Sequence, residues 1–365
     1  MDFIKKVLSD PSLAAFSASG FAPLQSYYDA SALATKTLFT SSPSSVSIAT
    51  MLLAVFYCWQ WNLSGYWSWV DRCWSILPAI YAITFALWPG ASSREVVMAV
   101  LATLWGIRLS YNFARKGGYG SEEDYRWPVL RAWFKKNDPF HPLFQEVFNL
   151  SFVSFYQHAL IWGFVAPPMF VASQNKTPLN TNDVVLTVMF IVFLVLETWT
   201  DETQWAFQNA KYAMTAQERK AAGGDFARGF CTTGPFKFSR HLNFFSEQSI
   251  WVTFYLFSVS SKPGSPLINW SFAGAFLLIL LFQGSTQMTE ALTLAKYPAY
   301  AAYQHSTSRL LPWFPGPSLD SADGKLITRN VSSTTEKDQV DTSSGNGGNG
   351  GAKKDRRRSK SSKSQ

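Results

Sequence analysis

Apolar residues in this chain fall into blocks that are separated by polar segments. A helix needs about 20 apolar residues to cross the hydrocarbon core of a bilayer. The pattern predicts membrane-spanning helices near residues 44–61, 69–88, 95–113, 148–171, 183–203, 244–260 and 268–288. Residues 11–40 are also apolar, but they are rich in Ser, Ala and Gly and include Asp29 and Lys36. We therefore predict an all-α, multi-pass integral membrane helical bundle with seven transmembrane helices, or eight if residues 11–40 also cross.

The composition agrees with a membrane protein once its uneven distribution is considered. Apolar residues make up 47% and aromatic residues 16% of the chain, yet the mean hydropathy is only −0.01, because polar loops and a polar tail dilute the blocks. From about Ser318 the sequence becomes rich in Ser, Thr, Gly, Asn and Asp, which is typical of a disordered tail. We predict an N-terminal segment at 1–43, a membrane domain at 44–316, and a disordered tail at 317–365 with a basic end.

The positive charges indicate an orientation. The tail's last thirteen residues carry seven Lys or Arg and one Asp, most of the chain's formal charge of +8, so the basic balance does not indicate a nucleic-acid-binding surface. Loops 114–147 and 204–243 contain six Lys or Arg each, whereas loops 173–182 and 261–267 contain one each. Because basic loops stay on the cytosolic side, we expect the two long loops and the C-terminus to face the cytosol.

A polar run enters one of the apolar blocks. The segment TGPFKFSRHLNFFSEQSIW places Arg240, His241, Asn243 and Glu247 at the start of block 244–260. An ionisable group at bilayer depth usually faces a partner or a polar cavity. Asn243 and Glu247 are four residues apart and therefore share a helix face, while Arg240 and His241 precede the helix, where an anion such as phosphate is favoured. The alternative is a basic anchor at the lipid headgroups followed by a single carboxylate.

Other polar residues are expected at the same cytosolic depth. Glu197, Asp201, Gln204 and Gln208 form a stripe along one helix face. Further polar residues near the predicted cytosolic ends of their segments are Asp71, Arg72, Arg108, Tyr111, Asn112, Arg115, Tyr125 and Arg126. Each arginine alone is explained by a structural ion pair or by snorkelling. Together they predict one polar pocket that opens to the cytosol.

The residue types limit what such a pocket binds. Several arginines with carboxylates and amides, and no glycine-rich turn after a strand, favour a phosphorylated or dinucleotide ligand held by side chains between helices. The chain has no HExxH or GxSxG motif and no His/Cys cluster. We therefore predict neither a metal site nor an acyl-transfer site.

A signature and five further motifs together resemble the steroid 5-alpha-reductase C-terminal superfamily. Gly234-Pro235-Phe236, Ser239-Arg240-His241, Asn243-Phe244 and Glu247 resemble its GLF/W-x-x-SRHPNY-x-x-E signature. The further motifs, in the same order as in that family, are VDRCWS at 70–75, WGIRL at 105–109, EDYRW at 123–127, E-x-x-x-D-x-x-Q at 197–204, and the closing YPAYAAYQ and PWFP. The resemblance covers roughly residues 50–316. Two positions depart from the family pattern: Leu242 stands where Pro is usual, and Gln208 where Lys is common.

The resemblance implies a helical membrane reductase that uses NADPH to saturate a carbon–carbon double bond conjugated to a carbonyl. The expected substrate is a steroid-, sterol- or lipid-like molecule in the endoplasmic reticulum membrane, and the expected partners are this substrate and membrane lipid, without metal or nucleic acid. The implied NADPH-binding residues are Arg108, Tyr125, Arg126, Asp201, Gln204, Arg240, His241, Asn243 and Glu247. Arg240 would meet a phosphate, and Asp201 and Asn243 would meet ribose hydroxyls or the carboxamide. Asp71 and Tyr111 are the candidate acids.

Two other functions remain open at this point. The isoprenylcysteine and phospholipid methyltransferases share the RHPxY element and bind S-adenosylmethionine in a similar helical cavity, so a lipid or prenylcysteine methyltransferase is the first alternative. The second is a membrane lipid-binding or scaffold protein that has the pocket but no chemistry.

Overall fold

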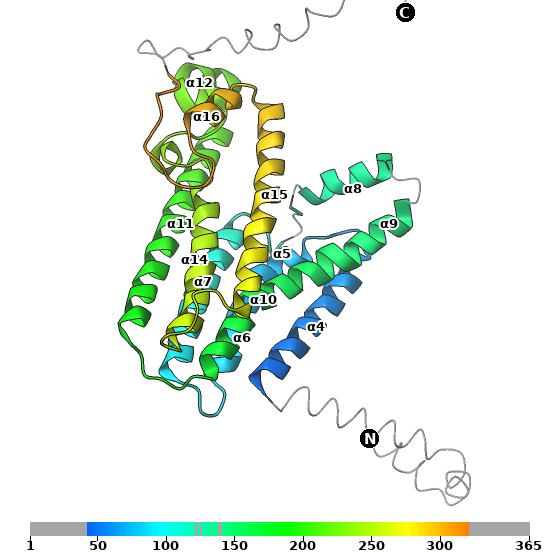
Figure 1. The fold of residues 1–365 in the computed structure, drawn as a ribbon. Coiled ribbons are helices and arrows are strands. Elements are labelled where there is room, and N and C mark those ends of the chain that lie inside the picture. Colours follow the sequence, from blue (N-terminus) through cyan, green and yellow to red (C-terminus); the bar gives the residue numbers. More distant parts are fainter. Residues whose placement is uncertain (1–41, 121–122, 125, 138–140, 321–365) are drawn as a thin grey trace, which may run out of the picture. The chain divides into compact units, whose positions relative to one another are not determined.

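The computed structural model describes residues 42–120, 123–124, 126–137 and 141–320, and within them the chain is helical, without strands (Figure 1). The α-helices are α4 (Pro43–Asn62), α5 (Trp69–Trp74), α6 (Leu77–Ala86), α7 (Ser93–Arg115), α8 (Arg126–Asn137), α9 (His141–Phe148), α10 (Gln157–Ser173), α11 (Thr181–Ala213), α12 (Ala216–Ala222), α13 (Gly224–Arg228), α14 (Leu242–Ser260), α15 (Ala273–Lys296) and α16 (Tyr300–Ser306). A π-helix, η1 (Asn149–Tyr156), precedes α10, and 3-10 turns η2 (Gly234–Lys237) and η3 (Trp270–Phe272) precede α14 and α15.

Local sequence signals explain where the long helices begin. The Ser42 side chain accepts a hydrogen bond from the Ser45 backbone N–H at 3.1 Å, and Pro43 occupies the first turn of α4. Proline suits this position because the first N–H groups of a helix have no intrahelical partner. α11 begins with a capping box in which the Asn180 and Asp183 side chains accept from each other's backbone N–H groups. At the start of α7, the Glu95 side chain accepts from the Ser92 backbone N–H at 2.7 Å.

α11 is longer than the sequence pattern predicts. Its 33 residues continue past the predicted end at 203 to Ala213, so the first part of the predicted loop 204–243 is helical. Likewise, the predicted loop 114–147 contains α8 and α9. The extension keeps the stripe from Glu197 to Gln208 on one continuous helix.

Four of these helices are long and apolar enough to cross a membrane, namely Pro43–Asn62, Ser93–Arg115, Thr181–Ala213 and Trp270–Lys296, the last of which combines η3 and α15. The chain is therefore a helical membrane protein, but the predicted count of seven or eight spans is wrong for the described residues. The predicted span 69–88 is split before Leu77, where Pro78 cannot continue a helix from the preceding turn. Predicted span 148–171 begins as a π-helix, and α14, although 19 residues long, carries several polar residues such as Asn243, Glu247 and Gln248. The eighth predicted span, 11–40, and the tail from 321 lie outside the described residues.

α14 lies at the centre of the bundle, against α7, α10, α11 and α15 (Figure 1). Its Trp251 packs at 4.7 Å between ring centroids against Trp105 of α7, and at 4.3 Å against Phe164 of α10. All three side chains are fully buried. This aromatic core fixes the relative positions of α7, α10 and α14, and therefore of the polar residues that these helices carry.

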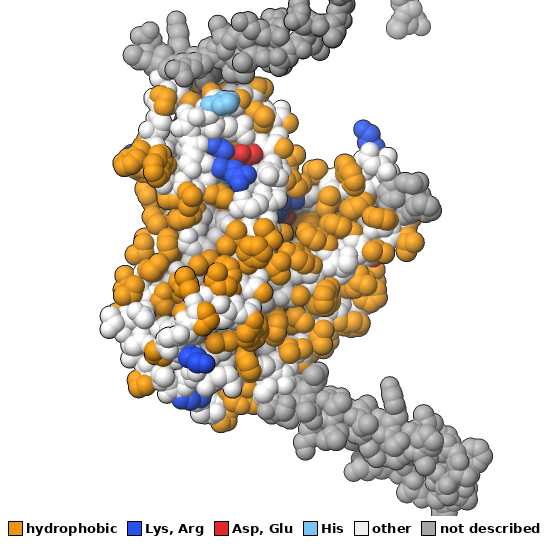
Figure 2. Space-filling view, in the orientation of Figure 1, with side chains coloured by type: hydrophobic (Ala, Val, Ile, Leu, Met, Phe, Trp, Pro, Cys, Tyr) orange, Lys and Arg blue, Asp and Glu red, His pale blue; other side chains and the backbone are white. Residues whose placement is uncertain are grey.

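The outer surface of the bundle is apolar, as expected for contact with lipid. Phe56 of α4 and Val195 of α11 are more than half exposed, and hydrophobic side chains cover most of the face shown in Figure 2. The few charged side chains on this face gather toward its two ends.

Candidate functional site

A buried polar cluster lies where α7, α11 and α14 meet. We call it the Arg108 cluster; it comprises Trp105, Arg108 and Asn112 of α7, Glu197 and Asp201 of α11, and Asn243, Glu247 and Trp251 of α14. Arg108 donates to Glu197 Oε1 at 2.6 Å through Nη1 and pairs with Asp201 Oδ2 through Nη2. Asn112 and Asn243 donate to the two Asp201 oxygens at 2.6 and 3.2 Å. The structure thus brings four predicted cofactor-binding residues, Arg108, Asp201, Asn243 and Glu247, into one place.

Two tryptophans hold Glu247. Trp105 Nε1 donates to Oε2 at 2.8 Å, and Trp251 Nε1 donates to Oε1 at 2.9 Å. These are the same two indoles that form the aromatic core, so packing of the core also fixes the carboxyl. Glu247 is only 7% exposed. Its orientation is therefore set before any ligand arrives.

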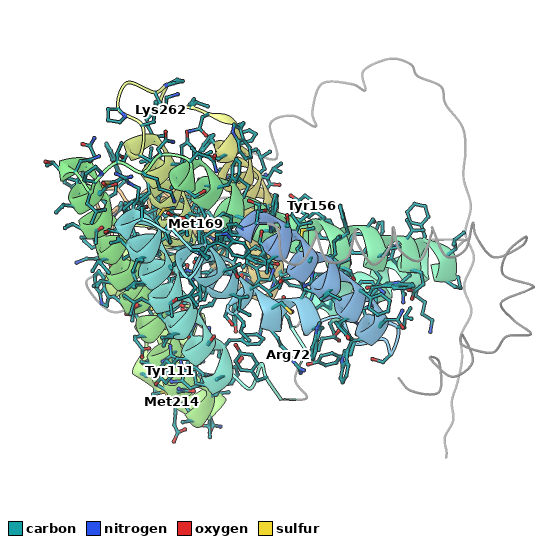
Figure 3. All side chains as sticks on the ribbon, turned by 90° about the horizontal axis from the view of Figure 1, so that it is seen from below. Arg72, Tyr111, Tyr156, Met169, Met214 and Lys262 are labelled. Atoms are coloured by element: carbon teal, nitrogen blue, oxygen red, sulfur yellow. The ribbon has the colours of Figure 1, made fainter. Side chains whose placement is uncertain are left out.

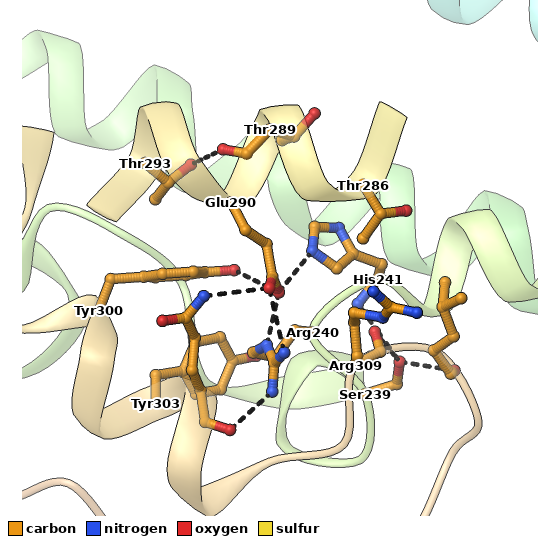
Figure 4. Close-up of polar contacts among 12 residues, drawn as sticks. Ser239, Arg240, His241, Thr286, Thr289, Glu290, Thr293, Tyr300, Tyr303 and Arg309 are labelled. Atoms are coloured by element: carbon orange, nitrogen blue, oxygen red, sulfur yellow. Dashed lines mark hydrogen bonds and ion pairs between the residues drawn. The ribbon is translucent and has the colours of Figure 1, made fainter. Parts of the chain in front are cut away.

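Arg240 belongs to a second, adjoining cluster, which centres on Glu290 of α15 (Figure 4). We call it the Glu290 cluster; it comprises Arg240, His241, Glu290, Tyr300 and Gln304. Arg240 donates to both Glu290 oxygens, at 2.7 Å from Nε and 3.2 Å from Nη2. His241 Nε2 lies 3.0 Å from Glu290 Oε1, and Gln304 Nε2 donates to Oε2 at 3.0 Å. Bidentate Arg–carboxylate pairs of this kind are strong and directional.

Arg240 also holds the segment that follows α16. Its Nη1 donates to the backbone carbonyls of Gln304, at 2.9 Å, and Thr307, and its backbone N–H donates to Ser308 O at 2.9 Å. These contacts, with those to Glu290, engage four of the five N–H groups of the guanidinium. In this structure Arg240 therefore ties the start of α14 to α15 and to the C-terminal side of α16.

The loop before the SRH motif is organised by Asp225 of α13. Its carboxylate accepts hydrogen bonds from the backbone N–H and hydroxyl groups of Thr232 and Thr233, and it pairs with Arg228 at 2.6 Å. Burial acts to raise the pKa of Asp225, but the hydrogen bonds, chiefly those from Thr232, hold it below its ordinary value. Gly234, which follows, has φ 59°, a left-handed conformation that suits glycine. The loop thereby turns the chain into η2 and α14.

The other predicted site residues lie elsewhere. Asp71 Oδ2 accepts a hydrogen bond from Trp127 Nε1 at 2.8 Å, beside α8. Arg126 pairs with Asp124 at 2.7 Å and is more than one third exposed. Tyr111 is 63% exposed, and it lies apart from Arg72, the neighbour of Asp71 (Figure 3). The two candidate acids are therefore not brought together, and Tyr125 lies outside the described residues.

Gln204 lies on the polar stripe of α11, one turn beyond Asp201. It is half-buried, and its side chain makes no hydrogen bond to another described residue that would compete for a ligand. The Gln204 amide is therefore available to hydrogen-bond a ligand.

Glu290 is the functional candidate that sequence reasoning missed. It lies two residues past the predicted span 268–288, on the last turns of α15, among threonines. A carboxylate placed just after an apolar block was the available signal. Its partner Arg240 is 50 residues away in the chain, so no local pattern connects the two.

Two cavities lie at the opposite end of the bundle from these clusters. One, of about 180 Å³, is lined by residues that include Ser42, Glu95 and Lys176, and the other, of about 310 Å³, by residues that include Asn182 and Lys262. No residue of the Arg108 or Glu290 cluster lines either of them. Within the part of the chain that the structure describes, no group of three His, Cys, Asp or Glu residues is placed to hold a metal ion.

Comparison with known proteins assigns a family to most of the chain. The profile of the family described as "Protein of unknown function (DUF1295)" matches residues 56–307. An uncharacterised protein of Schizosaccharomyces pombe, C594.04c, is 35% identical over 268 residues, which cover 70% of this chain and 75% of the yeast protein. No solved structure matches. The matched region contains both polar clusters.

Proposed function

Because the chain belongs to the DUF1295 family, which is related to steroid 5-alpha-reductase-like proteins, we propose that it is a membrane-embedded reductase. It would use NADPH to saturate a carbon–carbon double bond conjugated to a carbonyl in a lipophilic, steroid-, sterol- or lipid-like molecule. This activity is the one that the sequence motifs imply.

One observation carries the proposal. Arg108, Asp201, Asn243 and Glu247 come from three separate motifs and three helices, yet they meet in one cluster with buried, directed hydrogen bonds. If the arginines only anchored the protein at the lipid headgroups, these four side chains would not need to meet inside the bundle. Buried polar networks inside a helical membrane bundle usually mark a functional site.

The residues differ in how freely they could serve a cofactor. Asp201 and Asn243 present a carboxylate and an amide that suit ribose hydroxyls or a carboxamide, and Gln204 has an uncommitted amide one turn away. Asp201 also accepts hydrogen bonds from Arg108, Asn112 and Asn243, and Arg240 binds Glu290 and two carbonyls. In the proposed complex, Arg240 has one N–H left for a phosphate and otherwise supports the site through Glu290.

Ligand-dependent stabilisation tests the cofactor class. We expect NADPH to raise the melting temperature of the purified, detergent-solubilised protein, because a ligand at 100 times its Kd adds about 2.7 kcal/mol to the stability of the folded state. S-adenosylmethionine should leave it unchanged. A shift with S-adenosylmethionine alone would favour the methyltransferase alternative, and no shift with either would favour the scaffold alternative. Oxidation of NADPH on addition of a lipophilic enone then tests the reaction itself.

A variant of Gln204 tests the location of the site without disturbing the fold. Gln204→Ala should weaken NADPH binding by about two- to tenfold, the effect of one hydrogen bond, with the unliganded melting temperature unchanged. Gln174→Ala, an exposed glutamine at the other end of the bundle, is the matched control and should bind NADPH as the parent does. Equal affinity in the Gln204 variant and the parent would remove Gln204 from the site.

We also propose that the protein resides in the endoplasmic reticulum with its C-terminus in the cytosol. The loops with one lysine each meet at one end of the bundle, where Asn175 Nδ2 donates to Ser261 Oγ at 3.4 Å, and the cation-poor end is expected in the lumen. In sealed microsomes, a tag on the C-terminal tail should be digested by added protease. A protected tag would reverse the orientation.

A further inference from the structure

The charges of the Arg108 cluster do not balance. One guanidinium, Arg108, faces the three carboxyls of Glu197, Asp201 and Glu247, and the Glu197 and Asp201 side chains are about nine-tenths buried. Glu247 is buried to a similar degree. Burying two uncompensated charges is costly. Lys116, exposed at the end of α7, interacts electrostatically with Asp201, but among the described residues Glu197 and Glu247 have no cation of their own besides the shared Arg108.

One carboxyl oxygen of the cluster has no hydrogen-bond donor in the described part of the chain. Asp201 accepts from Arg108, Asn112 and Asn243, and Glu247 accepts from two indole N–H groups. Glu197 Oε1 accepts from Arg108 at 2.6 Å. Glu197 Oε2 is buried, and no donor among the described residues reaches it. It is the one carboxyl oxygen of the three residues that is left without a donor.

The Glu197 carboxyl instead lies within hydrogen-bonding reach of the Glu247 carboxyl. Two ionised carboxylates in direct contact in a buried place repel each other, and such pairs hold a proton between them. The charged groups that face Glu197 are Arg108 from α7, Asp201 from its own helix and Glu247 from α14. The one cation in this set is already shared between Glu197 and Asp201.

We propose that Glu197 and Glu247 share one proton, so that an O–H on Glu197 Oε2 donates to a Glu247 oxygen and joins α11 to α14. The proton supplies the donor that Glu197 Oε2 lacks and lowers the net charge of the cluster from −2 to −1. A metal ion is a poorer occupant, because the described residues contain no His, Cys, Asp or Glu group with metal-binding geometry.

The shared proton has a role in catalysis only if the proposed function holds. Saturating a carbon–carbon double bond adds a hydride to one carbon, as NADPH is oxidised to NADP⁺, and a proton to the other. Glu247 lies one helical turn after Asn243, an expected cofactor contact, whereas Asp71 and Tyr111 lie elsewhere. The Glu197–Glu247 pair would release its proton to the substrate and recover one from water.

Infrared spectroscopy tests the shared proton without any cofactor. A protonated carboxylic acid has a carbonyl stretch distinct from that of a carboxylate, and the band shifts in D₂O. At pH 7 the difference spectrum of parent minus Glu197→Gln should contain this band. The matched control is Glu202→Gln, on the same helix, whose carboxylate is 50% exposed and pairs with Arg115 at 2.5 Å; its difference spectrum should show the loss of a carboxylate only.

A second variant shows whether loss of the band reflects the shared proton or misfolding of the first variant. Glu247→Gln should also remove the carboxylic acid band, because the Glu197 carboxylate then accepts from the new amide, while one of the two indole N–H groups that met Glu247 loses its acceptor. Both Gln variants keep the shape of the parent residue and should elute as the parent does in size-exclusion chromatography. A parent without the band at pH 7, or a band that persists in both variants, overturns the proposal. Because the test uses the unliganded protein, failure of NADPH binding would overturn the proposed function and leave the shared proton standing.

Discussion

Three arginines of α7 contact acidic residues of α11, and the two whose partners are buried, Arg94 and Arg108, have different surroundings. Arg94 lies near the start of α7 and Arg108 about 21 Å further along the helix, at 1.5 Å per residue. Arg94 forms a bidentate pair with Asp183, at 2.9 and 2.8 Å, and it also donates to the carbonyls of Thr177 and Pro178. Asp183 accepts from Ser260 as well. One cation meets one anion there, and both Asp183 oxygens accept hydrogen bonds.

The Arg108 cluster is not closed in this way. It holds one cation for three carboxyls, and one buried oxygen of Glu197 has no donor among the described residues. The comparison separates two uses of buried charge in one bundle. The balanced pair fastens loop 173–182 and the end of α14 to α7 and α11, whereas the unbalanced cluster has a carboxyl oxygen that a proton would satisfy.

The largest expected effect comes from breaking the balanced pair. Arg94→Ala leaves Asp183 buried without its cation, and removal of one partner of a buried ion pair typically costs about 3–5 kcal/mol. Reversible unfolding in detergent should show this loss. Lys262→Ala is the control, because Lys262 is exposed and makes no ion pair with a described residue. If Arg94→Ala unfolds at the parent midpoint, the pair is not the fastening that we infer.

Arg240→Ala should have the next largest effect. Glu290 keeps His241 and Gln304, so the loss should be about 2–3 kcal/mol, the scale of hydrogen bonds to charged groups. Limited proteolysis should then cut the segment after α16 more rapidly, and Arg240→Lys should be intermediate because lysine lacks the planar fork. A variant that loses NADPH binding while keeping its stability and protease resistance would instead place Arg240 on the cofactor phosphate.

The smallest effect is expected at Asp225, a carboxylate outside the membrane spans that is fully hydrogen-bonded. Its folded pKa lies below its ordinary value. It therefore stabilises the fold above the unfolded pKa of about 3.9, and this contribution is lost as the pH falls through the folded pKa. Asp225→Asn should cost about 1 kcal/mol at pH 7, and the difference from the parent should shrink below about pH 4. Unfolding midpoints of the two proteins between pH 3 and pH 7 would reveal this. A difference independent of pH would contradict the assignment.

The sequence predicted well where helices form, but it predicted poorly which of them cross the membrane. Helices form in all seven predicted blocks, because apolar runs and capping residues such as Ser92 and Asn180 act within a few residues of one another. Whether a helix is long and apolar enough to cross depends on interruptions such as the one at Pro78, and among the described residues four helices meet both conditions. The end of α11 was also missed, because a polar helix that packs against protein has no apolar signal.

The apolar blocks alone indicate a helical membrane protein, and helical spacing alone places Glu197, Asp201 and Gln204 on one face of a helix. The partners of the charged groups, in contrast, depend on how the helices pack. Trp105 meets Glu247 across 142 residues, and Arg240 meets Glu290 across 50. The physical reason is that a buried charge must find a partner wherever packing places one. That packing is set by the aromatic contacts among α7, α10 and α14, which no local pattern encodes.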